Sequence, residues 1–277
     1  MKSPGKLFSL TGQVAVITGG CSGIGYAIAS GFASASARVV VIDVADRQAR
    51  PQGTDHVRAD VSDQKQVRKA SEAVLKKHGK VDILVNCAGI AEFDLSMNLS
   101  RREWDRILGV NLTGTFNCSQ AFGRVMVERR YGRIINLGSR CGYVGLPFHP
   151  AYNASKAGII SLTQTLAVEW GSFNINVNAI VPGFVRTAMN AKDLADPKAT
   201  AVYALKIPLG RVSEPEDLVG PAIFLASPAS SYVTGAVIAV DGGNLASGGL
   251  GTEIRNEHFR NIGIDVGGDA PDRSVRP

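Results

Sequence analysis

Residues 14–25 read VAVITGGCSGIG, and this stretch decides the fold class. Its first four residues form an apolar run, and four glycines follow before an alanine-rich amphipathic segment. This order predicts a buried strand, a tight turn and a helix. Glycine permits backbone angles closed to other residues and lets the main chain approach a pyrophosphate at the positive end of the helix. The stretch therefore predicts a dinucleotide-binding turn at the start of an α/β domain.

A second apolar run, residues 39–42, ends in Asp43, eighteen residues past Gly25. An acid roughly 20 residues beyond such a turn accepts hydrogen bonds from the adenosine ribose. A 2′-phosphate carries about −1.5 to −2 charges and is repelled by a carboxylate, so Asp43 favours NAD over NADP as the cofactor. Arg47, four residues further, is the only nearby basic residue that could favour NADP.

Apolar strand-like runs alternate with helical patterns along the rest of the chain. Further strands are predicted at 56–60, 82–86, 133–137, 175–180 and 236–240, and helices at 63–78, 101–128, 151–171 and 213–226. The last helix is expected to begin with an S-x-x-E capping box formed by Ser213 and Glu216. This alternation predicts an α/β fold with a Rossmann-like, doubly wound parallel sheet of about seven strands in a single domain. The ligand is expected beyond the carboxyl ends of the strands.

Tyr152 and Lys156 stand four residues apart in the predicted helix 151–171 and therefore share one face. Moving a tyrosine pKa from about 10 to about 7 takes roughly 4 kcal/mol. One cation at about 4 Å, in an effective dielectric of about 20, supplies about 4 kcal/mol. Such a spacing occurs by chance in many helices. With Ser139 thirteen residues before Tyr152, it predicts a proton-transfer site that works near neutral pH.

With these residues in order, the sequence resembles the short-chain dehydrogenase/reductase family from its start to about Gly243. The family pattern T-G-x-x-x-G-x-G is met by Thr18, Gly19, Gly23 and Gly25. Other family marks follow in sequence at Asp60, Val61, Asn86, Cys87, Ala88, Gly89, Asn111, Pro182, Gly183 and Thr187.

The resemblance implies reversible hydride transfer between a secondary alcohol and a nicotinamide ring. It gives Tyr152 the proton transfer, has Lys156 lower the tyrosine pKa and hold the nicotinamide ribose, and has Ser139 fix the substrate oxygen. Asn111 completes the implied catalytic set by anchoring a water that links Lys156 to solvent. Alternatively, Asn111 only breaks or kinks its helix.

The resemblance also implies a set of cofactor-binding residues along the carboxyl edge of the sheet. Asp60 is expected at the adenine and Thr187 at the nicotinamide carboxamide, although Asp60 could instead cap the next segment and Thr187 could merely start a loop. The full set is Gly19, Ser22, Gly23, Ile24, Gly25, Asp43, Asp60, Val61, Asn86, Ala88, Gly89, Tyr152, Lys156, Pro182, Gly183 and Thr187.

The substrate is less clearly specified. Residues 183–209 are expected to form a mobile lid, and they contain no evident clamp for an anion. Cys141, His149 and Phe184 are candidates to line the substrate pocket. Stretches 120–126 and 134–139 are similar to bacterial polyol dehydrogenases, which implies a polyol or sugar alcohol. A 3-oxoacyl thioester reductase, and more remotely a non-catalytic NAD-binding sensor or scaffold, are the alternatives.

Composition excludes several other classes. The net charge of +6 arises from 30 basic and 24 acidic residues that are scattered along the chain, so we expect no nucleic-acid partner. The four cysteines show neither C-x-x-C spacing nor clustering with histidine, which predicts reduced thiols and no metal. No run of about 18 apolar residues and no secretory signal are present, so a cytoplasmic protein without a membrane partner is expected.

Residues 244–277 extend past the family pattern and are rich in glycine. They are expected either to be a flexible tail or to reach over a pocket of the same or a neighbouring subunit. The apolar anchors for the second case would be Ile254, Phe259, Ile262 and Ile264. Because family members are commonly tetramers, the resemblance implies a homotetramer with a catalytic domain at residues 1–243.

Overall fold

A seven-stranded parallel sheet forms the centre of the computed structural model, which describes residues 4–45, 49–248, 256 and 260. The strand order is β3-β2-β1-β4-β5-β6-β7, so the predicted doubly wound sheet is confirmed. Its strands are β1 (Val14–Thr18), β2 (Arg38–Asp43), β3 (Asp55–Arg58), β4 (Ile83–Asn86), β5 (Gly132–Leu137), β6 (Ile175–Pro182) and β7 (Val237–Val240).

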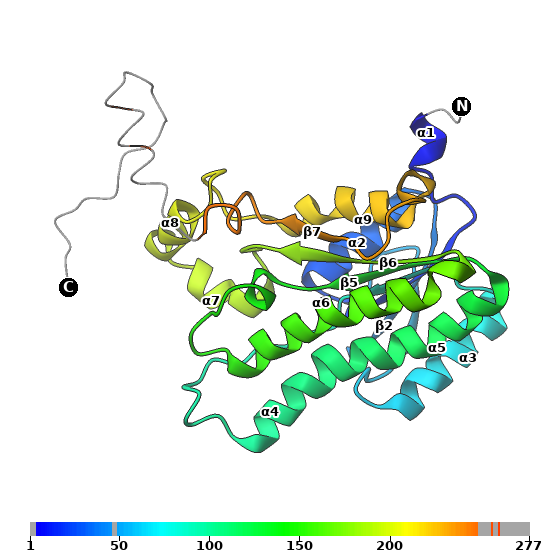
Figure 1. Cartoon of the computed structure of the whole chain (residues 1–277), viewed down its shortest axis with the longest axis horizontal. Helices are drawn as coiled ribbons and strands as arrows, with labels where there is room; N and C mark the ends of the chain where they lie inside the picture. The colour runs from blue at the N-terminus through cyan, green and yellow to red at the C-terminus, as the bar shows by residue number, and fades with distance from the viewer. Residues whose placement is uncertain (1–3, 46–48, 249–255, 257–259, 261–277) are drawn as a thin grey trace.

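Helices cover both faces of the sheet (Figure 1). They are α1 (Pro4–Leu7), α2 (Gly23–Ser34), α3 (Gln64–His78), α4 (Arg101–Leu108), α5 (Gly114–Arg129), α6 (Pro150–Trp170), α7 (Ala191–Leu194), α8 (Pro197–Leu205) and α9 (Val219–Ala226). Alternate strand residues enter two separate cores: Ile17 and Val41 pack with α2 and α9, whereas Val16 and Val40 pack with α3, α5 and α6. Burial on both faces explains why these strands read as continuous apolar runs.

The strand order reverses between β1 and β4, because the chain after β1 crosses toward β2 and the chain after β4 crosses toward β5. The register places Thr18, the last residue of β1, beside Ile42 of β2 and Asn86 of β4. The carboxyl ends of these strands therefore lie at one edge of the sheet. In folds of this kind ligands bind at such a reversal.

The helix predicted at 101–128 is interrupted. It consists of α4, a π-helical turn η2 (Gly109–Thr113) and α5. Asn111 lies in this wide turn, where its side chain bonds to two other segments. Turns of this kind inside α-helices are frequent at functional sites.

The capping box predicted at Ser213 and Glu216 is wrong. The 3₁₀ turn η6 (Pro215–Leu218) begins after Glu214, and Asp217 completes its capping box, while α9 starts only at Val219. Proline is favoured at the first helical position because its φ angle is already fixed near the helical value. Pro215 therefore becomes the first residue of η6, and the cap moves from the predicted Ser213 to Glu214. The hydroxyl of Ser213 instead donates to Asp217, at 2.9 Å.

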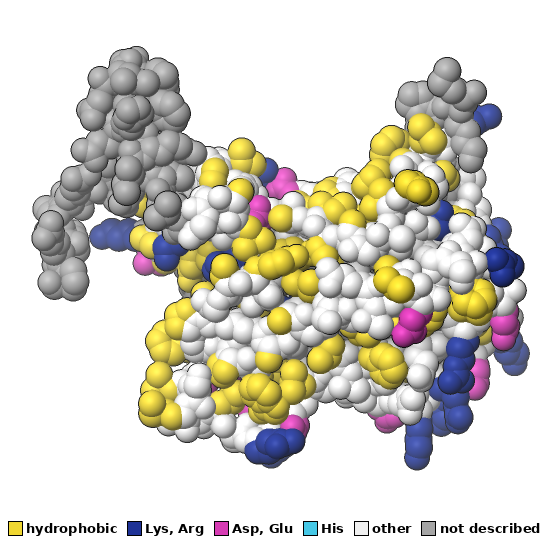
Figure 2. Space-filling view, viewed as in Figure 1, with side chains coloured by type: hydrophobic (Ala, Val, Ile, Leu, Met, Phe, Trp, Pro, Cys, Tyr) yellow, Lys and Arg dark blue, Asp and Glu magenta, His cyan; other side chains and the backbone are white. Residues whose placement is uncertain are grey.

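The described part of the chain contains no helix that is both long and apolar enough to cross a bilayer. Nor do its His, Cys, Asp and Glu side chains form any group of three that could hold a metal ion. Figure 2 shows the Lys and Arg side chains of one face in separate groups, several of them beside Asp or Glu.

The expected lid, 183–209, follows β6 and carries a 3₁₀ turn η5 (Ala188–Asn190), α7 and α8. Its movement stays a prediction. Arg47 and the four expected tail anchors, Ile254, Phe259, Ile262 and Ile264, lie outside the described residues.

Candidate active site

The glycine turn brings three segments of the expected cofactor site together. A Cβ atom on Gly19, whose φ is +67°, would lie 2.7 Å from the Cα of Ala88. A Cβ on Gly25 would lie 2.2 Å from the carbonyl oxygen of Gly19, and one on Gly23 would lie 3.3 Å from Cγ2 of Thr187. Larger residues therefore do not fit at Gly19 or Gly25, and the bare backbone of the turn remains available to a ligand.

The loop after β4 runs beside this turn. The hydroxyl oxygen of Thr18 accepts hydrogen bonds from the backbone N–H groups of Cys87 (3.0 Å) and Ala88 (3.1 Å). A Cβ on Gly89 would lie 3.7 Å from Nζ of Lys156. The loop thus connects the glycine turn to the expected catalytic lysine.

Asp43 is held beside the turn at the end of β2. Its Oδ2 accepts from the N–H of Cys21 and its Oδ1 from the N–H of Ala45, each at 3.0 Å. Arg50 is also close: its charge lowers the pKa of Cys21, although burial raises that pKa overall to about 11. The Nε of Arg50 is buried and has no hydrogen-bond partner among the described residues. Arg47 is therefore not the only basic residue near Asp43, which corrects the sequence analysis.

Asp60 forms a local turn after β3. Its Oδ1 accepts from the backbone N–H and from the hydroxyl of Ser62, at 2.9 and 2.7 Å. Asp63, not Asp60, caps α3. Val61 is buried against Gly114. A Cβ atom added to Gly114 would lie 2.6 Å from Cγ2 of Val61. Contact of Asp60 and Val61 with the adenine stays a prediction.

Asn86 is directed into the interior of the protein. Its Nδ2 donates to Oγ of Ser119 (3.0 Å) and to Oδ1 of Asn136 (2.8 Å), and Asn136 in turn donates to Thr163 (2.9 Å). This chain of hydrogen bonds joins β4 and β5 to the helices α5 and α6. These hydrogen bonds fix the carboxyl end of β4, where the loop after β4 begins.

Lys156 lies one helical turn after Tyr152 on α6, as predicted. Its Nζ donates to the carbonyl oxygen of Leu137 at 2.7 Å and lies 5.5 Å from the centre of the Tyr152 ring. The lysine is 5 % exposed, and this burial lowers its pKa to about 8. Its ammonium group is thus held between the end of β5 and the tyrosine.

The pKa of Tyr152 shifts in the direction opposite to the sequence expectation. Burial raises it to about 12, while a hydrogen bond with Ser139 and the charge of Arg140 act to lower it. Removal of the phenol from water outweighs these contacts, because burial penalises the charged form. In the protein without cofactor, Tyr152 is therefore a neutral phenol near pH 7.

Asn111 pins the loop after β4 to the catalytic helix. Its Oδ1 accepts from the N–H of Ile90 (2.9 Å), and its Nδ2 donates to the carbonyl of Ile90 (2.9 Å) and to Oγ of Ser155 (3.0 Å). Asn111 lies in an irregular, π-helical turn, and its side chain also bonds outside its own helix, so a break in the helix is not its only effect. The water that it was expected to anchor stays a prediction.

Glu92 is a site residue that the sequence analysis missed. Its Oε1 accepts from the N–H groups of Ala151 (2.8 Å) and Tyr152 (3.0 Å), so a buried carboxylate caps the start of α6. The backbone carbonyl of Glu92 also contacts Nδ1 of His149. A negative charge at a helix N-terminus is favourable. No local spacing signals this cap, because 59 residues separate Glu92 from Ala151.

Of the three residues expected in the substrate pocket, Cys141 and His149 lie near Tyr152, and Phe184 contacts Tyr203 and Arg140. Cys141 is buried and donates its N–H to Oγ of Ser139 at 3.2 Å. The His149 ring lies 6.3 Å from the Tyr152 ring, centre to centre. Phe184 packs against Tyr203, at 4.5 Å between ring centres.

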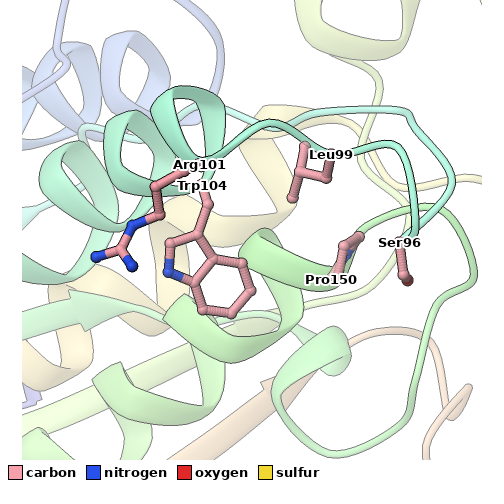
Figure 3. Close-up of a pocket in the computed structure, with 5 residues that line it drawn as sticks. All are labelled: Ser96, Leu99, Arg101, Trp104 and Pro150. Carbon is pink, nitrogen blue, oxygen red and sulfur yellow. The ribbon is translucent and has the colours of Figure 1, made fainter.

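A separate hollow of about 420 Å³ lies near the start of α6 (Figure 3). It is lined by Ser96, Leu99, Arg101, Trp104 and Pro150. None of the expected catalytic side chains lines it, so it is not where the reaction would occur.

Known proteins that are similar to this chain are named as dehydrogenases and reductases. A family model described as enoyl-(acyl carrier protein) reductase matches residues 19–244. The chain is 40% identical over 245 residues to a D-threitol dehydrogenase of Mycolicibacterium smegmatis, covering 85% of this chain and 94% of that protein. It is also 40% identical over 243 residues to a 3-oxoacyl-(acyl-carrier-protein) reductase of Thermotoga maritima, covering 84% and 98%.

A solved structure shows the same architecture. The crystal structure of a gluconate 5-dehydrogenase from Burkholderia cenocepacia, in complex with NADP and tartrate, is similar with a TM-score of 0.84 and 33% identity. The match covers 87% of this chain and 98% of that one.

Proposed function

Because the chain belongs to the short-chain dehydrogenase/reductase family, we propose that it oxidises a secondary alcohol of a polyol or sugar alcohol to a ketone with NAD. One observation carries the proposal: Ser139, Tyr152 and Lys156 lie together beside a glycine turn in which Gly19 and Gly25 have no room for a side chain. A bare turn at the reversal of strand order, with Asp43 beside it, fits a nicotinamide dinucleotide.

Ser139, Tyr152 and Lys156 have separate roles in the proposed oxidation of the alcohol. The hydroxyl group of Ser139 donates to the substrate oxygen, and Tyr152, once ionised in the loaded enzyme, accepts the hydroxyl proton of the substrate as the carbinol C–H bond breaks. A bound nicotinamide supplies the acceptor for the hydride. Lys156 holds positive charge near the phenol, and its bond to Leu137 keeps the ammonium group in place. The alcohol thus loses a hydride and a proton and becomes a ketone.

The proposed cofactor preference rests on Asp43. Its carboxylate is fixed beside the glycine turn and would repel a 2′-phosphate, which supports NAD. Arg50 acts in the opposite direction, and the similar gluconate 5-dehydrogenase was crystallised with NADP. We therefore expect NAD to be preferred and NADP to be accepted more weakly.

Reduction of a 3-oxoacyl thioester is the second candidate function. The observation that favours it is the 40% identity to the Thermotoga maritima reductase, equal to that with the threitol dehydrogenase. Asp43 counts against it, because reductases of that kind usually use the phosphorylated cofactor.

We also propose a cytoplasmic homotetramer in which residues 1–243 form the catalytic domain and 244–277 an extension. The family match ends at residue 244, which supports this division. Light scattering of the full chain and of a chain truncated after Asn244 tests it, since loss of the tetramer on truncation would assign the extension to assembly.

The deciding experiment measures NAD reduction by the purified protein with four- to six-carbon polyols and the corresponding sugar acids, simple secondary alcohols and 3-hydroxyacyl thioesters. Turnover confined to polyhydroxylated substrates of one stereochemistry supports the proposal. Turnover of thioesters alone selects the second candidate, and no turnover with any of them rejects both.

A further inference from the structure

Arg140 follows Ser139 directly and belongs to the 3₁₀ turn η3 (Arg140–Gly142) after β5. Its guanidinium carbon lies 4.2 Å from the centre of the Phe184 ring, and Phe184 packs in turn on Tyr203 of α8. A cation over an aromatic face is attracted by it, and the contact fixes the plane of the guanidinium. The stack joins the turn that carries Ser139 to the segment 183–209.

Within the described part of the chain, no carboxylate pairs with the guanidinium group of Arg140. Arg186 pairs with Glu214 at 3.1 Å and Arg211 with Asp217 at 2.7 Å. Arg140, by contrast, has no carboxylate partner and no side-chain hydrogen bond among the described residues, although it is half-buried. A guanidinium held on one face with its N–H donors unused can bind a planar carboxylate through two parallel hydrogen bonds.

Arg140 is also in the right place to act on the substrate. It adjoins Ser139, which holds the reacting oxygen in the proposed function, and its charge reaches Tyr152. The expected lid contains no evident anion clamp of its own. The cation comes instead from the turn after β5, and Phe184 brings the two segments together.

We propose that Arg140 binds a carboxylate of the substrate, so that the polyhydroxylated substrate is a sugar acid or related hydroxy acid. This inference rests on the proposed oxidation of a polyhydroxylated substrate, and it replaces one terminal alcohol of that substrate by a carboxylate. A phosphate could use the same donors, but one guanidinium balances the single charge of a carboxylate, whereas a phosphate monoester carries about −1.5 to −2.

The test compares substrates that differ only at one terminal carbon. The pairs are D-gluconate with D-glucitol and D-threonate with D-threitol, and D-glucitol 6-phosphate is the phosphate probe. We expect higher kcat/KM for the acid of at least one pair. Arg140→Gln should lower kcat/KM for that acid roughly 10- to 100-fold, mainly through KM, while changing the neutral partner less than about threefold.

Three further variants sharpen the test. Arg140→Lys should restore part of the acid preference, because it keeps the charge but not the paired donors. Phe184→Leu should lower the preference by removing the aromatic face. Arg68→Gln removes an exposed charge on α3 that pairs with Glu72, and it should change nothing.

A binding measurement separates this inference from the proposed function. In Tyr152→Phe with NAD bound, calorimetry should show acid binding tighter than neutral binding, and the difference should vanish when Arg140→Gln is added. If this binding difference is found but the unaltered protein turns over no substrate, the proposed function is rejected and the carboxylate site at Arg140 is retained. Equal binding of acid and neutral partners, or no binding of either, overturns the inference, as does a preference for the phosphate that Arg140→Gln abolishes.

Discussion

The proposed cofactor side and the proposed substrate side of the site are built in different ways. On the proposed cofactor side, close approaches of the backbone dominate: Gly19 and Gly25 meet within one turn, and the parallel strands β1 and β4 end side by side. On the substrate side, single side chains reach across long stretches of chain, as Glu92 does to α6 and Arg140 does to Phe184. On the cofactor side few substitutions can be tolerated, because a larger residue would displace the backbone. On the substrate side a substitution can remove one side-chain contact and leave the others in place. We infer that binding of the dinucleotide is set by backbone shape and substrate choice by a few side chains.

The largest expected effect comes from Tyr152, where the two sides meet. Tyr152→Phe removes the proton-transfer group and keeps the ring, so kcat should fall roughly 10²- to 10⁴-fold. The affinity for NAD, measured by fluorescence titration of the reduced cofactor, should stay within about twofold because the glycine turn is untouched. Turnover close to the unaltered rate would remove Tyr152 from the mechanism.

The second-largest expected effect, a loss of NAD affinity, tests the cofactor side. Gly25→Ala places a methyl group 2.2 Å from the carbonyl oxygen of Gly19, so the turn must shift. We expect the affinity for NAD to fall roughly 100-fold, or about 2.7 kcal/mol, by calorimetry. Gly220→Ala near the start of α9 is the matched control, since nothing lies within 4 Å of its added Cβ. It should leave NAD binding unchanged and can stabilise the helix by up to about 1 kcal/mol. Equal binding by both variants would contradict the assigned turn.

Local signals explain why the strands and helices that carry the site could be predicted from sequence. The strand expected at 133–137 is β5, which begins one residue earlier, and Tyr152 and Lys156 share α6 because a four-residue spacing fixes a helical face. The substrate side lacked such signals. The cap by Glu92 joins residues that no periodicity relates, and the π turn at Asn111 depends on bonds to Ile90 and Ser155.

The pKa of Tyr152 could not be predicted from the spacing for the same reason. The expectation counted the attraction of one cation and omitted the loss of hydration. In the folded protein burial is the larger contribution, and the ammonium group of Lys156 lies at 5.5 Å from the ring centre and is bonded to Leu137. Charge and burial oppose each other here, and only the three-dimensional contacts determine which prevails.

This pKa gives a pH prediction. With a value of about 12 in the protein without cofactor, Tyr152 should be ionised in only about one molecule in a thousand at pH 9. The ultraviolet difference spectrum between the unaltered protein and Tyr152→Phe should therefore show no phenolate up to about pH 10. Alcohol oxidation needs the phenolate, so its rate should rise about tenfold per pH unit below the pKa of the loaded enzyme. A phenolate signal at pH 8 without cofactor would contradict the effect of burial.

Glu92 tests whether the long-range contacts of the substrate side position the chemistry. Glu92→Ala leaves the N–H groups of Ala151 and Tyr152 without their acceptor, and we expect kcat to fall roughly tenfold with NAD affinity unchanged. Glu92→Gln keeps an acceptor oxygen and should recover most of the rate. A purely structural cap would lower the melting temperature of both variants but leave the dependence of kcat on pH unaltered, whereas a shifted Tyr152 moves that profile.

The smallest effect concerns the two opposite charges beside the glycine turn. Asp43→Asn removes the repulsion of a 2′-phosphate, so kcat/KM with NADP should rise relative to NAD by roughly tenfold. Arg50→Gln should change the ratio in the other direction by only about threefold, because a partly exposed charge contributes less than about 1 kcal/mol. Steady-state kinetics with both cofactors at several salt concentrations measure the two ratios. If Arg50→Gln changed the ratio more than Asp43→Asn, the arginine would dominate the choice, and NADP would become the expected cofactor.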